Sequence, residues 1–139
     1  MAPATNDFGA NLRVLYASDF YTLGVSQAER AALLRRTPQI FPATAALREE
    51  NERVIACFKR CLVEGIVVDM RNAPPNNDEL FEAAMHRLRT AVGKTFRRVV
   101  VVVASAAGEM QVTRLHRKER ASYRVTRDYT QAWRLAADA

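Results

Sequence analysis

The chain has 139 residues, of which 49% are hydrophobic and 26% are charged. This length and composition suit one globular domain and exclude a wholly disordered chain. No apolar run approaches the roughly 18 residues of a membrane-spanning helix, and residues 1–11 lack the pattern of a signal peptide. We therefore expect a cytoplasmic protein without a membrane span, with a mobile N-terminus over residues 1–11 and a single domain over residues 12–137.

The positive charge is concentrated in the C-terminal third. The formal net charge is +6, and between Lys94 and Arg127 nine basic residues face only Glu109 and Glu119. Such a surface favours acidic partners. The candidate residues for an anionic surface or nucleic acid are Arg114, Arg117, Lys118, Arg120 and Arg124. The chain contains no recognised nucleic-acid motif, so nucleic acid is the less favoured partner.

The first part of the chain predicts a hairpin followed by a helix. Leu12–Tyr16 and Tyr21–Val25 alternate as strands do, and the turn residues between them favour a hairpin. Gly24 suggests a bulge or a close approach of two backbones. Ser26 and Glu29 have capping-box spacing, which predicts a short helix over Gln27–Arg36.

The middle of the chain predicts a helix, a strand and a second helix. Apolar residues follow helical spacing from Ala45 to Val63, with Cys57 and Cys61 on the apolar side as plain thiols. Ile66–Asp69 is typical of a buried strand. After a loop, Asn76 with Glu79 marks the start of a helix that ends near Gly93.

The segment Arg97–Ser105 contains five consecutive valines and predicts a strand that is buried on both faces. Residues 109–120 fit either a helix or a strand, and we prefer the helix. Ser122–Arg127 then predicts the last strand, and Asp128 caps a final helix. The expected fold class is α/β, with a single mixed, mostly parallel sheet of four to five strands and flanking helices.

No catalytic or metal-binding constellation is visible. Asp69 is the best-placed acid, but neither a second acid nor a histidine lies near it in the sequence, which argues against a general base. His86 and His116 form no ligand spacing with each other or with the cysteines. We expect a protein that is not an enzyme and has no cofactor and no metal.

The order of these elements resembles the STAS domain, the sulfate transporter and anti-sigma factor antagonist family. The resemblance rests on IVVD leading into a loop and a helix, on the valine strand before a basic helix, and on YRVTRDYTQAW as a closing strand and helix. It covers roughly Leu12 to Ala137 and is closest to the stand-alone bacterial members. It implies a non-enzymatic adaptor that docks on a protein partner in a regulatory complex.

The same resemblance locates the partner site, because the regulatory serine or threonine of the family lies in the loop after the strand matching Ile66–Asp69. This chain has no serine or threonine from Met70 to Arg89, and that position falls among Asn76, Asn77 and Asp78. The resemblance therefore implies a constitutive adaptor that is not switched by phosphorylation. The candidate partner-binding residues are Asp69, Arg71, Asn72, Asn76, Asn77, Asp78 and Glu82.

The sequence supports one further prediction and leaves two alternatives open. We expect Arg71 and Asn77 to be exposed, so that reversing Arg71 to Glu would weaken partner binding with little effect on stability. A homodimer is possible through edge strands near Leu12 to Val25, although the charge of Arg13 protects such an edge. A small apolar ligand between the sheet and the helices is a further alternative.

Overall fold

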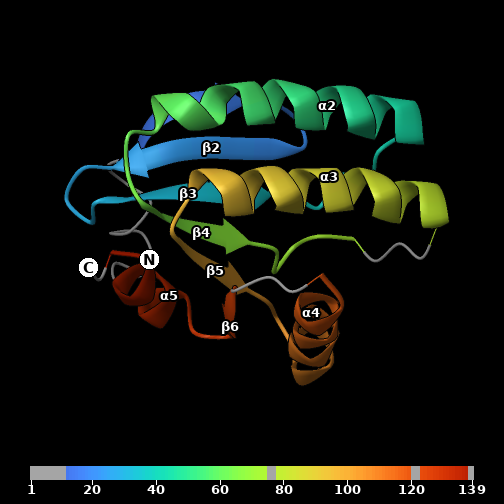
Figure 1. Cartoon of the computed structure of the whole chain (residues 1–139). Helices are drawn as coiled ribbons and strands as arrows, with labels where there is room; N and C mark the ends of the chain where they lie inside the picture. Colours follow the sequence, from blue (N-terminus) through green and yellow to red (C-terminus); the bar gives the residue numbers. More distant parts are fainter. Residues whose placement is uncertain (1–11, 75–77, 120–122, 138–139) are drawn as a thin grey trace.

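A six-stranded sheet forms the centre of the molecule, with its strands in the order β1-β2-β3-β4-β5-β6 (Figure 1). The structure is a computed structural model, and it describes residues 12–74, 78–119 and 123–137. The strands are β1 (Leu12–Ala17), β2 (Tyr21–Ser26), β3 (Ala31–Arg36), β4 (Gly65–Asp69), β5 (Arg98–Val102) and β6 (Arg124–Thr126). The helices are α2 (Thr44–Cys57), the short 3-10 helix η1 (Phe58–Arg60), α3 (Glu79–Thr95), α4 (Ala106–Glu119) and α5 (Tyr129–Ala137).

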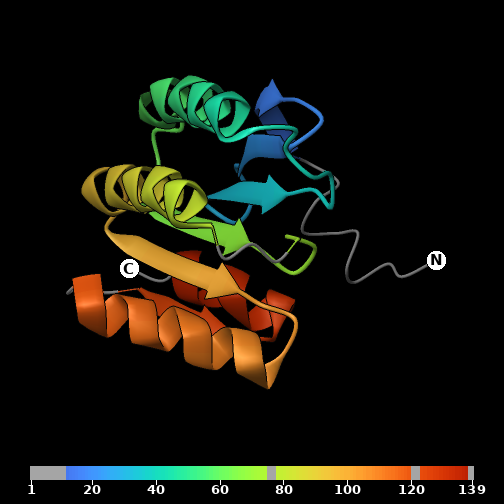
Figure 2. The same ribbon diagram turned by 90° about the vertical axis from the view of Figure 1, so that its right-hand side faces the viewer.

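Helices cover both faces of the sheet. Leu47 of α2 and Leu88 of α3 share one apolar cluster with the sheet, whereas Trp133 of α5 belongs to the cluster on the opposite face. Figures 1 and 2 show α4 lying across the direction of α3 and not alongside it. None of the helices within the described residues is long and apolar enough to cross a membrane.

The α/β class is confirmed, but the predicted sheet was too small and too uniformly parallel. The sheet has six strands; β1 with β2 and β2 with β3 pair antiparallel, and the three remaining pairs are parallel. The strand that the sequence prediction lacked is β3. The parallel half follows the usual logic of strand, helix and strand connections, and the antiparallel half is a meander.

Residues 31–36 were predicted as part of a helix, and that prediction was wrong. The Oγ of Ser26 does accept a hydrogen bond from the backbone N–H of Glu29 at 3.2 Å, as the capping pattern suggested. The bond closes a turn, because Arg30 adopts φ 55° and the chain reverses into β3. β3 pairs with β2 and β4 and is almost entirely buried, so pairing on both sides outweighs the helix preference of alanine, leucine and arginine.

The first hairpin and its glycine match the prediction. β1 pairs with β2, and the register shifts between Val14 and Tyr16, opposite Gly24 and Leu23. A Cβ atom on Gly24 would lie 3.2 Å from the carbonyl oxygen of Arg13. The bulge and the close backbone approach therefore both occur at this glycine.

The valine strand is buried on both faces, as predicted. Val99, Val101 and Val103 pack toward α2 and α3, whereas Val100 and Val102 pack toward α5. The preferred helix for the segment 109–120 is confirmed over 109–119, since α4 runs from Ala106 to Glu119, and Arg120 lies outside the described residues. Residues 1–11, predicted to be mobile, lie outside the described residues.

Candidate functional site

Asp69 lies at the carboxyl end of β4 and organises the loop that follows it. Its side chain is 2% exposed and accepts hydrogen bonds from Arg71 Nε at 2.9 Å, Arg71 Nη2 at 2.9 Å and the Arg71 backbone N–H at 3.2 Å. Arg35 Nε, at the end of the neighbouring strand β3, donates a fourth hydrogen bond at 3.0 Å. The Asp69 carboxylate thus links the ends of β3 and β4 to the start of the loop after β4.

Tyr129 of α5 joins this cluster from the helix that covers the same face of the sheet. Arg35 Nη2 donates to the Tyr129 hydroxyl at 2.8 Å, and the Arg71 guanidinium lies 4.4 Å from the centre of the Tyr129 ring. This second contact is close enough for a cation–π interaction. We name Arg35, Asp69, Arg71 and Tyr129 the strand-end cluster.

The surroundings of Asp69 favour its ionised form. Burial alone would raise the pKa of Asp69, but hydrogen bonds from the side chain and backbone of Arg71, the charge of Arg71 and the hydrogen bond from Arg35 together lower it below its ordinary value. The side-chain hydrogen bond to Asp69 in turn raises the pKa of Arg71. Asp69 is therefore a poor proton acceptor, and the strand-end cluster is a structural ion-pair network.

The structure corrects the expectation for Arg71 and separates the predicted partner residues into two groups. The side chain of Arg71 is only 31% exposed and is bound to a buried acid, so Arg71→Glu would damage the fold. Asn72 and Asp78 are exposed, and Asp78 caps α3 by accepting from the Leu80 N–H at 3.2 Å. Glu82 is half-buried and bonds to Arg89, whereas Asn76 and Asn77 lie outside the described residues.

The predicted basic surface lies on α4 and β6. Arg114, Arg117 and Lys118 are exposed along α4, and none of them makes an ion pair with a described residue. Arg124 is exposed on β6, against which α4 packs. Arg120 lies outside the described residues.

The other chemistry-bearing side chains form no centre. No group of three or more histidine, cysteine, aspartate or glutamate side chains that could hold a metal occurs among the described residues. His116 packs edge-on against the ring of Tyr123. Cys57 and Cys61 are free thiols, Cys61 fully buried and Cys57 partly buried.

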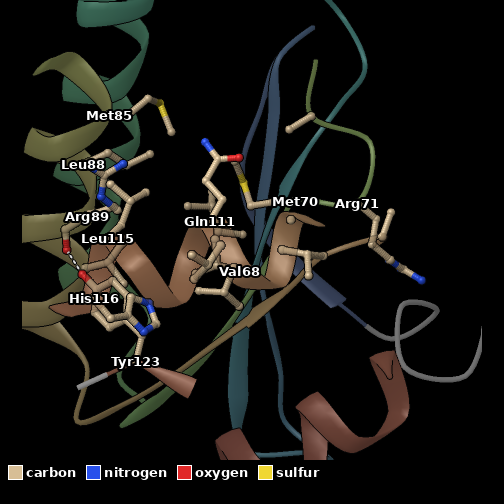
Figure 3. A pocket seen from close by; sticks show the side chains of 18 of the residues that line it. Val68, Met70, Arg71, Met85, Leu88, Arg89, Gln111, Leu115, His116 and Tyr123 are labelled. Atoms are coloured by element: carbon tan, nitrogen blue, oxygen red, sulfur yellow. Dashed lines mark hydrogen bonds between the residues drawn. The ribbon is translucent and has the colours of Figure 1, made fainter. Parts of the chain in front are cut away.

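A pocket of about 460 Å³ opens between the sheet, α3 and α4, and we call it the helix-sheet pocket. Val99 and Val101 of β5 and the adjacent Val103 line its floor, and one face each of α3 and α4 lines its walls. Figure 3 shows this pocket with Leu88 of α3 and Leu115 of α4 among the labelled lining residues. The α4 residues that line it are Ala107, Gly108, Gln111, Val112, Leu115 and His116. Their repeat at three and four residues was a visible signal in the sequence, but the arrangement of α4 against α3 was not.

Sequence reasoning also missed two members of the strand-end cluster. Arg35 was placed in a helix, and Tyr129 was treated only as a core residue of the last helix. Both lie far from Asp69 in the sequence, and only the pairing of β3 with β4 and the packing of α5 bring them to it.

Comparison with known proteins adds no relative. No protein-family model, no curated protein and no solved structure matches this chain. The STAS resemblance therefore stays a prediction from the sequence pattern.

Proposed function

We propose that this protein is a non-enzymatic adaptor domain of the STAS-like type, which binds a protein partner in a bacterial regulatory complex without a phosphorylation switch. The observation that supports the proposal is the use of Asp69. The best-placed acid of the domain is buried and ionised, and its oxygens serve to hold the loop after β4. The start of the loop, at Arg71, is fixed in this way, and a fixed segment loses little conformational entropy when a partner binds.

The exposed residues around that loop have the mixed character of a docking surface. Leu80, in the first turn of α3, is 64% exposed, and Ile40, in the connection after β3, is 70% exposed. Both follow the carboxyl ends of parallel strands, so they lie at the same end of the sheet as Asn72 and Asp78. An apolar residue surrounded by polar side chains is typical of a protein contact. We name Ile40, Asn72, Asp78 and Leu80 the docking surface.

The proposal is tested by comparing two leucine substitutions. Leu80→Glu places a charge in the docking surface, whereas Leu62→Glu changes a leucine that is 87% exposed at the opposite end of β4. Each variant and the wild type serve as bait in host lysate, and bound proteins are quantified by mass spectrometry. We expect Leu80→Glu to reduce capture of the partner about tenfold or more, as loss of a central interface residue does.

The same experiment contains the outcomes that contradict the proposal. Equal capture by Leu80→Glu and the wild type would remove the docking surface. Stoichiometric phosphate on Thr90 or Thr95 of the recovered protein would contradict the constitutive adaptor, because these hydroxyls lie in α3, the helix that the loop leads into.

A second candidate function, binding of an anionic surface, is favoured by one observation. Arg114, Arg117 and Lys118 are three exposed cations on one helix without ion-pair partners among the described residues. We expect weak binding to nucleic acid that falls steeply with salt, since each phosphate contact releases counterions. Tight, sequence-selective binding at physiological salt would make this the primary function.

A further inference from the structure

We infer that the helix-sheet pocket binds an uncharged ligand with an aliphatic chain. The pocket measures about 460 Å³. This lies within the roughly 300–1,000 Å³ of small-molecule sites and well above the ~150 Å³ of a cavity left by removing one side chain. The inference is independent of partner docking.

The pocket exists because α4 crosses α3 and does not pack along it. Figure 2 shows α4 running along the lower edge of the molecule, across the direction of α3. Both helices line the pocket over the same face of the sheet. No residue of α4 whose side chain is described is fully buried, although the stripe that faces the pocket includes Val112 and Leu115. The apolar side of this helix is therefore only partly covered, whereas an amphipathic helix normally buries that side.

The lining selects for an aliphatic body. The floor is valine, and the α3 wall contains Met85, Leu88 and Val92. Methionine side chains adapt to ligands of different shapes, and Met70 and Met85 both line the pocket. Branched and thioether side chains on three sides match a flexible hydrocarbon chain better than a flat aromatic ring system.

The charges of the lining are already compensated. Its three charged residues are Arg71, Glu82 and Arg89. Arg71 is bound to Asp69 at 2.9 Å, and Arg89 is bound to Glu82 at 2.5 Å. In Figure 3 the guanidinium of Arg71 extends away from the pocket. A charged ligand would have to be desolvated without a free counter-charge, which is costly.

One uncharged polar group is aimed inward. Figure 3 shows the amide of Gln111 pointing into the pocket between Met70 and Met85. An amide offers both a donor and an acceptor, so it suits a hydroxyl or an ester group on the ligand. The ligand class that fits is thus an aliphatic chain carrying at most one uncharged polar group.

The test uses three probes and three variants of the full chain. Isothermal titration with decanol, decanoic acid and naphthol compares an uncharged chain, the same chain with a charge, and a flat aromatic alcohol. Val112→Trp and Gln111→Trp fill the pocket from α4, and Met110→Trp is the matched control because Met110 is 63% exposed and does not line the pocket. Gln111 is exposed, so its variant will fold even where Val112→Trp does not. Unfolding midpoints check each variant.

We expect saturable binding of decanol at one site per chain, with weaker binding of decanoic acid and naphthol. The pocket-filling variants should weaken decanol binding by about tenfold or more, the discrimination that a change of one methylene produces in an apolar pocket. Met110→Trp should bind as the wild type does. The inference is overturned if decanol shows no saturable binding, if decanoic acid or naphthol binds more tightly, or if Met110→Trp weakens binding as much as the pocket-filling variants.

Discussion

Replacing Asp69 by asparagine tests the role assigned to the strand-end cluster. The substitution keeps the shape of the side chain but removes its charge and places an amide NH₂ where an acceptor oxygen stood. The four hydrogen bonds from Arg35 and Arg71 lose their ionised acceptor. Two cationic side chains then remain around a neutral amide.

The size of the effect follows from the burial of the partners. Removing one member of a fully buried ion pair costs about 3–5 kcal/mol, because the other charge is left uncompensated. Here the acid is 2% exposed, but the side chains of Arg35 and Arg71 are 35% and 31% exposed and so remain partly hydrated. We therefore expect Asp69→Asn to lower the free energy of unfolding by about 2–3 kcal/mol, below the value for a fully buried pair.

The assay is urea unfolding followed by the fluorescence of Trp133. This is the one tryptophan of the chain, and it is fully buried in α5, one turn after Tyr129. The control is Glu52→Gln, which breaks a pair with Arg87 in which both side chains are more than half exposed. Such a surface pair contributes about 1 kcal/mol at most.

The pH dependence of stability provides an independent check on the role of Asp69. The pKa of Asp69 is lowered from 3.8 in the folded protein, so its contribution is complete above that pH and is lost as the pH falls toward the folded-state pKa. The gap between the wild type and Asp69→Asn should therefore narrow in acid. Two results would refute the ion-pair role of the strand-end cluster. Asp69→Asn could be as stable as Glu52→Gln, or the difference in stability between the wild type and Asp69→Asn could stay constant into the acid range.

Three further predictions concern the core. The backbone amides of Val99 to Val103 should be the slowest to exchange with deuterium, because a strand buried on both faces opens only with global unfolding; fast exchange there would contradict the sheet described above. Gly65→Ala should lower the free energy of unfolding in urea by about 1–3 kcal/mol through overpacking, because the added Cβ would lie 1.8 Å from the carbonyl oxygen of Ala136. Gly108→Ala is the control and should be tolerated, because its nearest contact is 3.4 Å away. Equal losses of stability in the two variants would refute the close packing of Gly65 against α5. Burial raises the pKa of the Cys61 thiol to about 11, so iodoacetamide should modify it far more slowly in the native protein than in urea, as peptide mass mapping would show; equal rates would contradict its burial.

The sequence alone determined the elements whose residue pattern is stable in only one kind of surroundings. Five consecutive valines have no polar side to turn to water, so β5 had to be covered on both faces, and it is. The acids at the start of α3 and the apolar spacing within α2 indicated helices for similarly local reasons. Gly24 signalled the bulge because only a residue without a side chain admits the neighbouring backbone so closely.

Only the tertiary structure decided the features that depend on distant partners. Residues 31–36 contain good helix formers, and they form a strand because β2 and β4 supply backbone hydrogen bonds and cover on both sides. Asp69 became a structural anchor because Arg35 reaches it from β3, and Tyr129 of α5 in turn accepts a hydrogen bond from Arg35. The helix-sheet pocket arises because α4 runs across the direction of α3 and does not pack along it. Local propensity amounts to a few tenths of a kcal/mol per residue, so pairing and burial between distant segments override it wherever the two disagree.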